Sequence, residues 1–164
     1  MKSKNNWETQ PRKENGEFTF RFLKGENILK KQFEKIAQRL SEKQLIKELE
    51  QSKVKFSKEE IVFITKSKSG KIVWLEKGNE KAGLMHIENA HGDDFNKKGI
   101  SNAKIPDLLL ELLKRGVDTG KKQGRHKNAR PIFEVNFEGK ILKVAITISE
   151  NGFLVGANPC SSEN

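Results

Sequence analysis

The N-terminal part of the chain is polar at first and then alternates between apolar and polar positions. Residues 1–16 are polar, and we expect them to be mobile unless Trp7 finds a pocket. From Glu17 to Leu23, three phenylalanines alternate with polar residues. This period of two predicts a half-buried strand.

Two amphipathic helices are predicted next. Apolar residues recur at helical spacing at Leu29, Phe33, Ile36 and Leu40. Ser41 and Gln44 have the spacing of a capping box, which predicts that a second helix begins there and runs through Leu49. We expect the apolar stripes of both helices to belong to the core, and the lysines around them to form a solvated basic exterior.

The middle of the chain predicts a hairpin and two shorter helices. Ile61–Thr65 and Lys71–Leu75 are rich in apolar and β-branched residues, and the segment of Ser, Lys and Gly between them predicts a β-hairpin. Asn79 suits an N-cap and Gly92 suits the position after a helix end, so a short helix is predicted between them. Another helix is predicted from Pro106 to Gly116, with its leucines packed inward.

The C-terminal third predicts an antiparallel meander. The dipeptides Glu138-Gly139 and Asn151-Gly152 are hairpin signals that separate three strand-like runs. These runs are Pro131–Phe137, Lys140–Ser149 and Phe153–Asn158.

The register of this meander gathers polar residues on one face. Pairing Phe137 with Lys140 and stepping outward places Arg130 directly opposite Thr147. The second hairpin sets Ala145 beside Asn158. The polar residues on this face have no structural need to share a surface, although an ordinary salt-bridged surface is the alternative. They are Arg130, Thr147, Ser149 and Asn158.

Two of the three histidines lie in the predicted helix that ends before Gly92, and they are the groups best suited to proton transfer near neutral pH. His91 falls in the last turn, where the helix dipole favours an imidazolium, whereas desolvation of His86 favours a neutral imidazole. One helix thus offers an acid and a base. Two alternatives stay open: a C-capping His91 with a core His86, or a zinc or magnesium site completed by Asp93 and Asp94.

The charge of the chain indicates a polyanionic partner. Its 164 residues include 32 Lys and Arg against 22 Asp and Glu, which gives a formal net charge of +10 and a pI near 9.7. Such a balance favours nucleic acid, or an acidic membrane or protein surface. Residues 116–129 are interpreted as a flexible cationic loop suited to phosphate contacts, or else as a plain solvated linker. The basic side chains of this segment are Lys121, Lys122, Arg125, His126 and Lys127.

Composition and cysteine content limit the class of protein. The 34% of hydrophobic residues are enough for one core, in one ordinary domain or in a compact domain with an extension. The single cysteine, Cys160, excludes an internal disulfide framework and fits a reducing compartment. No apolar run has membrane-spanning length and no signal peptide follows Met1. We therefore expect a soluble chain that works in the cytoplasm, or is delivered to the cytoplasm of a target cell.

Several spaced motifs, taken in order, resemble one nuclease superfamily. They are Gly83-Leu84-Met85-His86 through His91, Phe95, Gly99-Ile100, the leucine-rich helix, Arg130 at the start of a strand, Thr147, Asn151-Gly152-Phe153 and Gly156-Ala157-Asn158-Pro159. Over roughly residues 60–160 the chain resembles the phage-associated branch of the barnase, EndoU, colicin and RelE-like nuclease superfamily. The resemblance implies an α+β fold, with N-terminal helices packed on a C-terminal antiparallel β-meander. It also implies metal-independent cleavage of RNA, often by a toxin.

The resemblance assigns roles to four residues. His86 and His91 match the paired histidines, Arg130 matches the basic strand residue, and Thr147 matches the hydroxyl position. The chain departs from the pattern at Ala90, where related sequences carry a basic residue, so that Arg125 or Lys127 would have to supply the charge. In this interpretation residues 1–56 are a polar N-terminus and helical extension and residues 57–164 are the nuclease-like domain, unless the whole chain is one compact domain.

The chemistry of such a reaction is consistent with these residue types. Cleaving RNA without a metal needs a base for the 2′-OH, an acid for the leaving 5′-oxygen and fixed positive charge for the phosphorane. We assign His86 as base and His91 as acid, with the two roles interchangeable, Arg130 as the phosphorane clamp and Thr147 as a hydrogen-bonding orienter. No metal or other cofactor is expected. The residues expected to bind substrate are Lys121, Lys122, Arg125, Lys127, Ser149 and Asn158.

The expected partners follow from this function. They are RNA and, for a toxin, a cognate antitoxin or immunity protein, with no membrane partner and the oligomeric state left open. A non-catalytic nucleic-acid-binding module is one competing interpretation. A metal-dependent nuclease that uses His86, His91 and Asp93 is the other.

Overall fold

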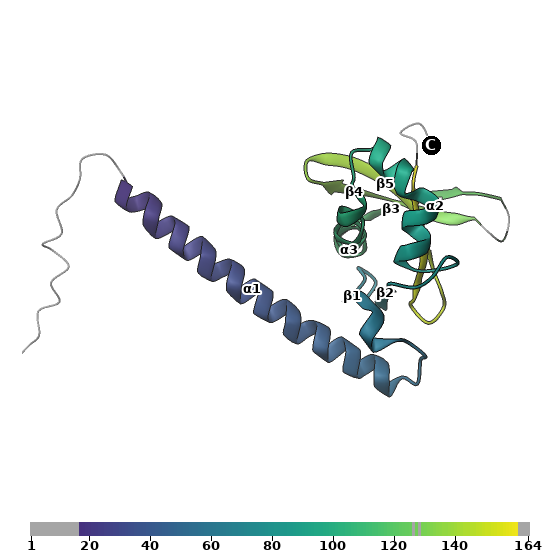
Figure 1. The fold of residues 1–164 in the computed structure, drawn as a ribbon, viewed down its shortest axis with the longest axis horizontal. Helices are drawn as coiled ribbons and strands as arrows, with labels where there is room; N and C mark the ends of the chain where they lie inside the picture. Colours follow the sequence, from purple (N-terminus) through teal and green to yellow (C-terminus); the bar gives the residue numbers. More distant parts are fainter. Residues whose placement is uncertain (1–16, 126, 128, 161–164) are drawn as a thin grey trace, which may run out of the picture. The chain divides into compact units, whose positions relative to one another are not determined.

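The computed structural model describes residues 17–125, 127 and 129–160, with their side chains from residue 25 onward. Within these residues the chain forms a long helix, a two-stranded hairpin, two shorter helices and a four-stranded antiparallel sheet (Figure 1). The elements are α1 (Glu17–Gln51), β1 (Ile61–Lys66), β2 (Ile72–Glu76), α2 (Leu84–Lys97), α3 (Ile105–Arg115), β3 (Val117–Gln123), β4 (Arg130–Phe137), β5 (Lys140–Ile148) and β6 (Leu154–Pro159), with short 3₁₀ helices at Lys58–Glu60 and Asn102–Lys104. The predicted α+β fold is confirmed. The expectation for residues 1–16 lies outside the described residues.

The first helix corrects two predictions. The strand predicted at Glu17–Leu23 is wrong, because these residues already belong to α1, and no new helix begins at Ser41. A helix satisfies its own backbone groups, whereas a strand needs a neighbour, and adding a residue to an existing helix costs less than starting a new one. Gln44 does not complete a capping box but donates from Nε2 to Glu48 Oε1 at 3.5 Å within the same helix.

The chain divides into two compact units, Met1–Ser41 and Glu42–Asn164. The division of the chain after residue 56 into an extension and a nuclease-like domain stays a prediction, and the last turns of α1 belong to the larger unit. There Leu45 and Leu49 are buried in a cluster with Ile64 and Trp74. In the smaller unit the predicted core stripe is wrong: Leu29 is 56% exposed and Phe33 is 70% exposed.

The β1–β2 hairpin is confirmed. Ile64 pairs with Trp74 and Thr65 with Val73. Trp74 is fully buried, and its indole Nε1–H donates to Glu76 Oε1 at 3.0 Å, which gives the buried polar atom its partner. A bridge between Trp74 and Phe153 joins the hairpin to the start of β6.

The boundaries of the histidine helix differ from the prediction. Its N-cap is Gly83, because Asn79 is used in a turn in which its Oδ1 accepts from the Lys81 N–H at 2.8 Å. Gly92 lies inside the helix, where a Cβ would meet Asn102 Oδ1 at 3.0 Å. A larger residue here would require the side chain of Asn102 to shift. The left-handed glycine past the helix end is Gly99, with φ of 80°.

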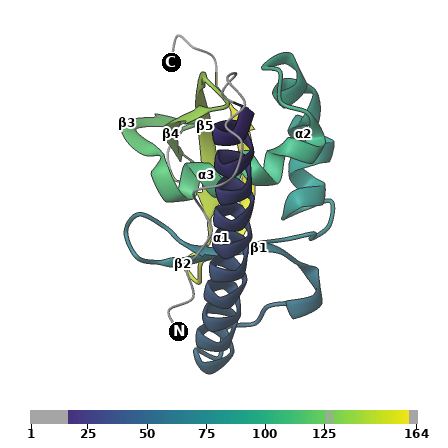
Figure 2. The same ribbon diagram turned by 90° about the vertical axis from the view of Figure 1, so that its left-hand side faces the viewer.

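The sheet has the strand order β3-β4-β5-β6, and α3 lies between it and the β1–β2 hairpin (Figures 1 and 2). The predicted helix with Pro106 in its first turn and Gly116 at its end is confirmed, and its leucines are buried. α2 packs along β6 at the edge of the sheet. β3 is a correction, because half of the predicted 116–129 loop forms this strand, although its register with β4 is irregular between Asp118 and Lys122.

The meander and its register are confirmed over most of their length. Phe137 pairs with Lys140, Phe133 with Val144, and Ala145 with Asn158. Since paired residues share a face, the strands present two faces. The core face, against the main hydrophobic cluster, carries Phe133, Val135, Val144 and Ile146. The site face carries Arg130, Ala145, Thr147 and Asn158.

Candidate functional site

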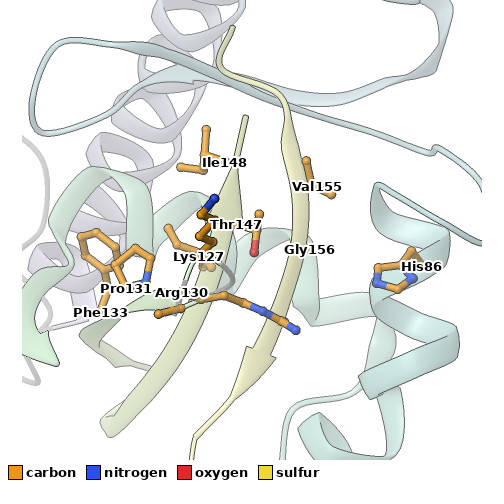
Figure 3. A pocket seen from close by; sticks show the side chains of 11 residues that line it. His86, Lys127, Arg130, Pro131, Phe133, Thr147, Ile148, Val155 and Gly156 are labelled. Atoms are coloured by element: carbon orange, nitrogen blue, oxygen red, sulfur yellow. The ribbon is translucent and has the colours of Figure 1, made fainter. Parts of the chain in front are cut away.

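A pocket of about 570 Å³ lies at one end of the sheet, against the N-terminal part of α2 (Figure 3). His86, Arg130 and Thr147 all line it, together with Lys127 and Gly156. Its apolar wall is formed by Pro131, Phe133, Ile146, Ile148 and Val155. Three of the four residues assigned to catalysis from the sequence thus meet in one cavity, which we call the site pocket.

The site pocket exists because β4 and β5 stop pairing near its entrance. Their register ends at Ile132 and Ala145, while Arg130 pairs with Gln123 of β3. Arg130 was predicted to pair directly with Thr147, but the β4–β5 register does not include this pair. The two side chains nevertheless line the same pocket. Where the strands separate, core-face residues such as Phe133 also reach the cavity, which gives it a polar and an apolar side.

His86 is held from both sides of its ring. Nδ1 lies 2.9 Å from the backbone oxygen of Glu80, and because a carbonyl only accepts, Nδ1 carries the proton of that hydrogen bond. The other edge of the ring lies against β6, where a Cβ built on Gly156 would be 3.8 Å from Nε2. Nε2 therefore remains for the pocket, toward which the ring points in Figure 3.

The residues that line the site pocket do not include His91, but its ring lies beside that of His86. The ring centroids are 6.3 Å apart, with the ring planes at 84° to each other. The Nδ1 atom of His91 is 3.8 Å from Asp94 Oδ2, and its side chain is 24% exposed. Residues five positions apart on a helix point in different directions around its axis. The imidazole rings are nevertheless large enough for the two side chains to approach each other.

The environment of His91 overturns the expectation of a favoured imidazolium. Burial, and then the positive charge of Arg130, lower the pKa of His91 below its usual value, while Asp94 acts in the opposite direction. The predicted dipole effect is missing because His91 lies within α2, two turns before the helix ends at Lys97. His91 is thus biased toward the neutral imidazole in the free protein, and the positive charge of Arg130 contributes to this bias.

Arg130 is fixed by a short chain of hydrogen bonds. Its Nη1 donates to Asn158 Oδ1 at 2.8 Å, and Asn158 Nδ2 donates to Gln123 Oε1 at 2.5 Å. Asn158 is only 7% exposed. It was predicted to bind substrate, but its position is that of a buried bridge that orients the guanidinium. Figure 3 shows the guanidinium extending from β4 toward the side on which His86 lies.

The other predicted substrate-binding residues are only partly brought together. Lys127 lines the site pocket. Lys121, Lys122 and Arg125 are exposed and are not part of its lining, and Lys122 pairs with Pro131, which turns it to the face opposite Arg130. Ser149 is a turn residue: its hydroxyl donates to the Phe153 carbonyl at 3.0 Å and also contacts Asn151. Of the two basic residues proposed to compensate for Ala90, the structure places Lys127 at the pocket.

The described part of the chain contains no group of three His, Cys, Asp or Glu side chains arranged as a metal ion would require. Asp93, which the metal-dependent alternative used, is exposed, and the carboxylate next to His91 is that of Asp94.

Two contributors were missed by reasoning from the sequence. Gln123 was overlooked because its position opposite Arg130 depends on β3, which has few apolar residues and three exposed basic or acidic ones. Gly156 was placed beside Thr147 in the predicted second hairpin and was noted in a motif, but no role was given to it. The signal for its role was available in the predicted pairing, since a residue without a side chain beside Thr147 leaves room for a ring from another element.

Comparison of the chain with models of known protein families gives no match, and comparison with curated proteins gives none either. Among the helices that the structure describes, none combines the length and the apolar character needed to cross a lipid bilayer. The case for a function therefore rests on the geometry of the site.

Proposed function

We propose that the protein is a metal-independent endoribonuclease of the superfamily that its motifs resemble. The observation that carries this proposal is the meeting of two histidine rings, 6.3 Å apart, with an arginine whose charge reaches His91 and whose side chain lines the same pocket as His86. Two imidazoles and a fixed cation are the groups that RNA transesterification requires.

His91 takes the role of base in this proposal. Its lowered pKa keeps it unprotonated near neutral pH, which a base needs before it accepts the proton of the ribose 2′-OH. This exchanges the roles first assigned to the two histidines, because α2 ends at Lys97 and not just after His91, so that the helix end does not favour a charged His91. The positive charge of Arg130 acts on His91 and would attract the substrate phosphate to the same region.

His86 takes the role of acid. Its Nδ1–H is bound to the carbonyl of Glu80 in both charge states, so Nε2 is the atom that gains and loses the proton. The 2′-oxygen attacks phosphorus, the bond from phosphorus to the 5′-oxygen breaks, and His86 protonates that oxygen while His91 holds the proton of the 2′-OH. The products are a 2′,3′-cyclic phosphate and a free 5′-hydroxyl.

The groups that line the site pocket together with His86 would position the phosphate. Arg130 neutralises the charge that builds up on the phosphorane, and the hydroxyl of Thr147 donates a hydrogen bond to one of its oxygens. Lys127 lies at the same pocket, where it would contact a phosphate of the substrate. The proposed mechanism draws its base, acid and cation from side chains alone.

The biological setting belongs to the same proposal. The net charge of +10 suits an RNA partner. An unregulated ribonuclease in the cytoplasm, whether in the producing cell or after delivery to another one, would act as a toxin. Such an enzyme calls for a cognate antitoxin or immunity protein as a second partner.

The test is to incubate end-labelled RNA with the purified protein in excess chelator and to analyse the ends of the products. The proposal predicts cleavage that leaves a 2′,3′-cyclic phosphate and a 5′-hydroxyl. Retention of RNA without cleavage would favour the non-catalytic binder, and cleavage that stops in chelator and leaves a 5′-phosphate would favour the metal-dependent alternative.

A further inference from the structure

A second pocket adjoins the site pocket on the core face of the sheet. It also has a volume of about 570 Å³, and it lies between the β1–β2 turn, the end of α3 and strands β3 to β5. Phe133, Ile146 and Ile148 line both cavities. Because β4 and β5 separate here, the two pockets meet across these three side chains at the open end of the sheet.

The second pocket combines an apolar interior with a polar rim. Val73, Leu112 and Leu113 contribute to its wall. The turn between β1 and β2 places two exposed lysines, Lys68 and Lys71, at the cavity. Apolar walls with a few polar groups are typical of small-ligand sites, and a volume of roughly 300–1,000 Å³ is the usual range for them.

Three other polar groups complete this rim. Ser67 and Ser69 lie in the same turn and share a hydrogen bond of 2.9 Å between their hydroxyl groups. The carboxylate of Asp118 accepts from the Gly120 N–H at 2.8 Å, and this leaves further lone pairs for a donor in the pocket. A nucleobase is complementary to such a pocket, because its faces are apolar and its edge carries hydrogen-bond donors and acceptors. The phosphate next to the base could be bound by the two lysines.

We propose that the second pocket binds a nucleobase of the RNA, beyond the two nucleotides at the cleaved phosphodiester. The inference rests on the proposed function and names its substrate class, which is an unpaired strand. A base inside a duplex is stacked between its neighbours, so only an unpaired segment can place one base in the second pocket while its phosphodiester lies at Arg130. Lys68 and Lys71 then contact the phosphate that joins the two positions.

The experiment measures binding of non-cleavable 2′-O-methyl oligoribonucleotides of defined, unpaired sequence to the full chain. The Lys68→Ala/Lys71→Ala variant is compared with Lys43→Ala/Lys47→Ala, which removes the same charge from exposed positions on α1. The first variant should bind a hexanucleotide about tenfold more weakly than the control variant and show a flatter salt dependence. Both variants should bind a dinucleotide alike, since it does not reach the second pocket.

A second arm identifies the base itself. Single abasic positions are placed in turn along the hexanucleotide. We expect a single sensitive position, outside the two nucleotides that flank the cleaved phosphodiester. An abasic site at that position should lower the affinity of the oligonucleotide for the wild-type chain about fivefold or more. The Val117→Trp variant, which fills the rim of the pocket from an exposed position, should abolish this preference.

Equal affinities of the two lysine variants for the hexanucleotide would overturn the inference, as would an abasic scan without a sensitive position or a wild-type chain that binds neither oligonucleotide. These readouts do not depend on cleavage. A sensitive base position in a protein that never cuts RNA would leave the pocket in place and remove the proposed activity instead.

Discussion

The two faces of the four-stranded sheet come from the same strands by simple alternation, yet their contents differ. On the core face Val144 is fully buried and packs in the main hydrophobic cluster. On the site face the side chain of Arg130 lines the site pocket and is hydrogen bonded to the side chain of Asn158. Successive residues of one strand therefore serve different purposes: those on the core face stabilise the fold, and those on the site face carry the proposed chemistry. Substitutions on the two faces should have different effects.

The largest effect should come from the histidines beside the site face. His86→Ala and His91→Ala should each lower the rate of RNA cleavage by about a hundredfold or more, because each removes a proton-transfer group. The rate is measured on labelled RNA at saturating substrate. Met85→Ala, an exposed neighbour on the same helix, is the matched control and should keep full activity, with the melting temperatures of all three variants close to that of the wild type.

A substitution on the core face should show the opposite pattern. Val144→Ala should lower the free energy of unfolding by about 2 kcal/mol, because it leaves a cavity in a fully buried position. Denaturant titration measures the loss, and the rate per folded molecule should stay the same. Ile141→Ala, at a 62% exposed position on the same strand, should change neither quantity appreciably. A large loss of rate in Val144→Ala with an intact fold would erase the contrast between the faces.

A smaller effect is expected where the site face is also buried. Asn158→Ala removes the acceptor of Arg130 and the donor to Gln123, so the guanidinium loses its fixed orientation. The rate should fall about tenfold, and the free energy of unfolding should drop by about 1–2 kcal/mol. Gln123→Ala should also lower the cleavage rate and the free energy of unfolding, but by smaller amounts. An unchanged rate in Asn158→Ala would show that the hydrogen bond does not position Arg130.

The smallest effect is a shift in the titration of His91, which NMR can follow without any substrate. Its pKa should lie below 6.5 in the wild type and rise in Arg130→Gln, while Asp94→Asn should lower it further. Because the folded chain resists protonation of His91, the unfolded chain binds more protons below pH 6.5. Stability should therefore fall as the pH drops below that value, and less steeply in His91→Gln.

The accuracy of the predictions differed between parts of the chain for a physical reason. The hairpins were predicted well because turn residues such as Glu138-Gly139 fix the register locally, and the pairing of Phe133 with Val144 follows from that turn. The helices were predicted less well at their ends. Asn79 and Gly92 have the right residue types for caps, but Asn79 closes a turn and Gly92 allows close packing on Asn102.

The site was predictable to a similar degree. The alternation of β4 and β5 was enough to place Arg130 and Thr147 on one face, and the motif around His86 supplied the helix residues. The chain of hydrogen bonds from Arg130 to Gln123 was not predictable, since β3 lacks the apolar alternation that marks a strand. The roles of the histidines also depended on tertiary contacts, because the charge of Arg130 acts on His91 across elements far apart in sequence.

A substrate with one deoxyribose tests the proposed cleavage by 2′-OH attack. The proposed nucleophile is the 2′-OH of the RNA itself, so replacing the ribose at the mapped cleavage site by deoxyribose should abolish cleavage there while binding changes by less than about twofold. The measurement compares the matched ribose and deoxyribose oligonucleotides in chelator, with affinity determined for both. Cleavage of the deoxyribose substrate at the same bond would contradict the proposed mechanism, because His91 would then have no 2′-OH to deprotonate.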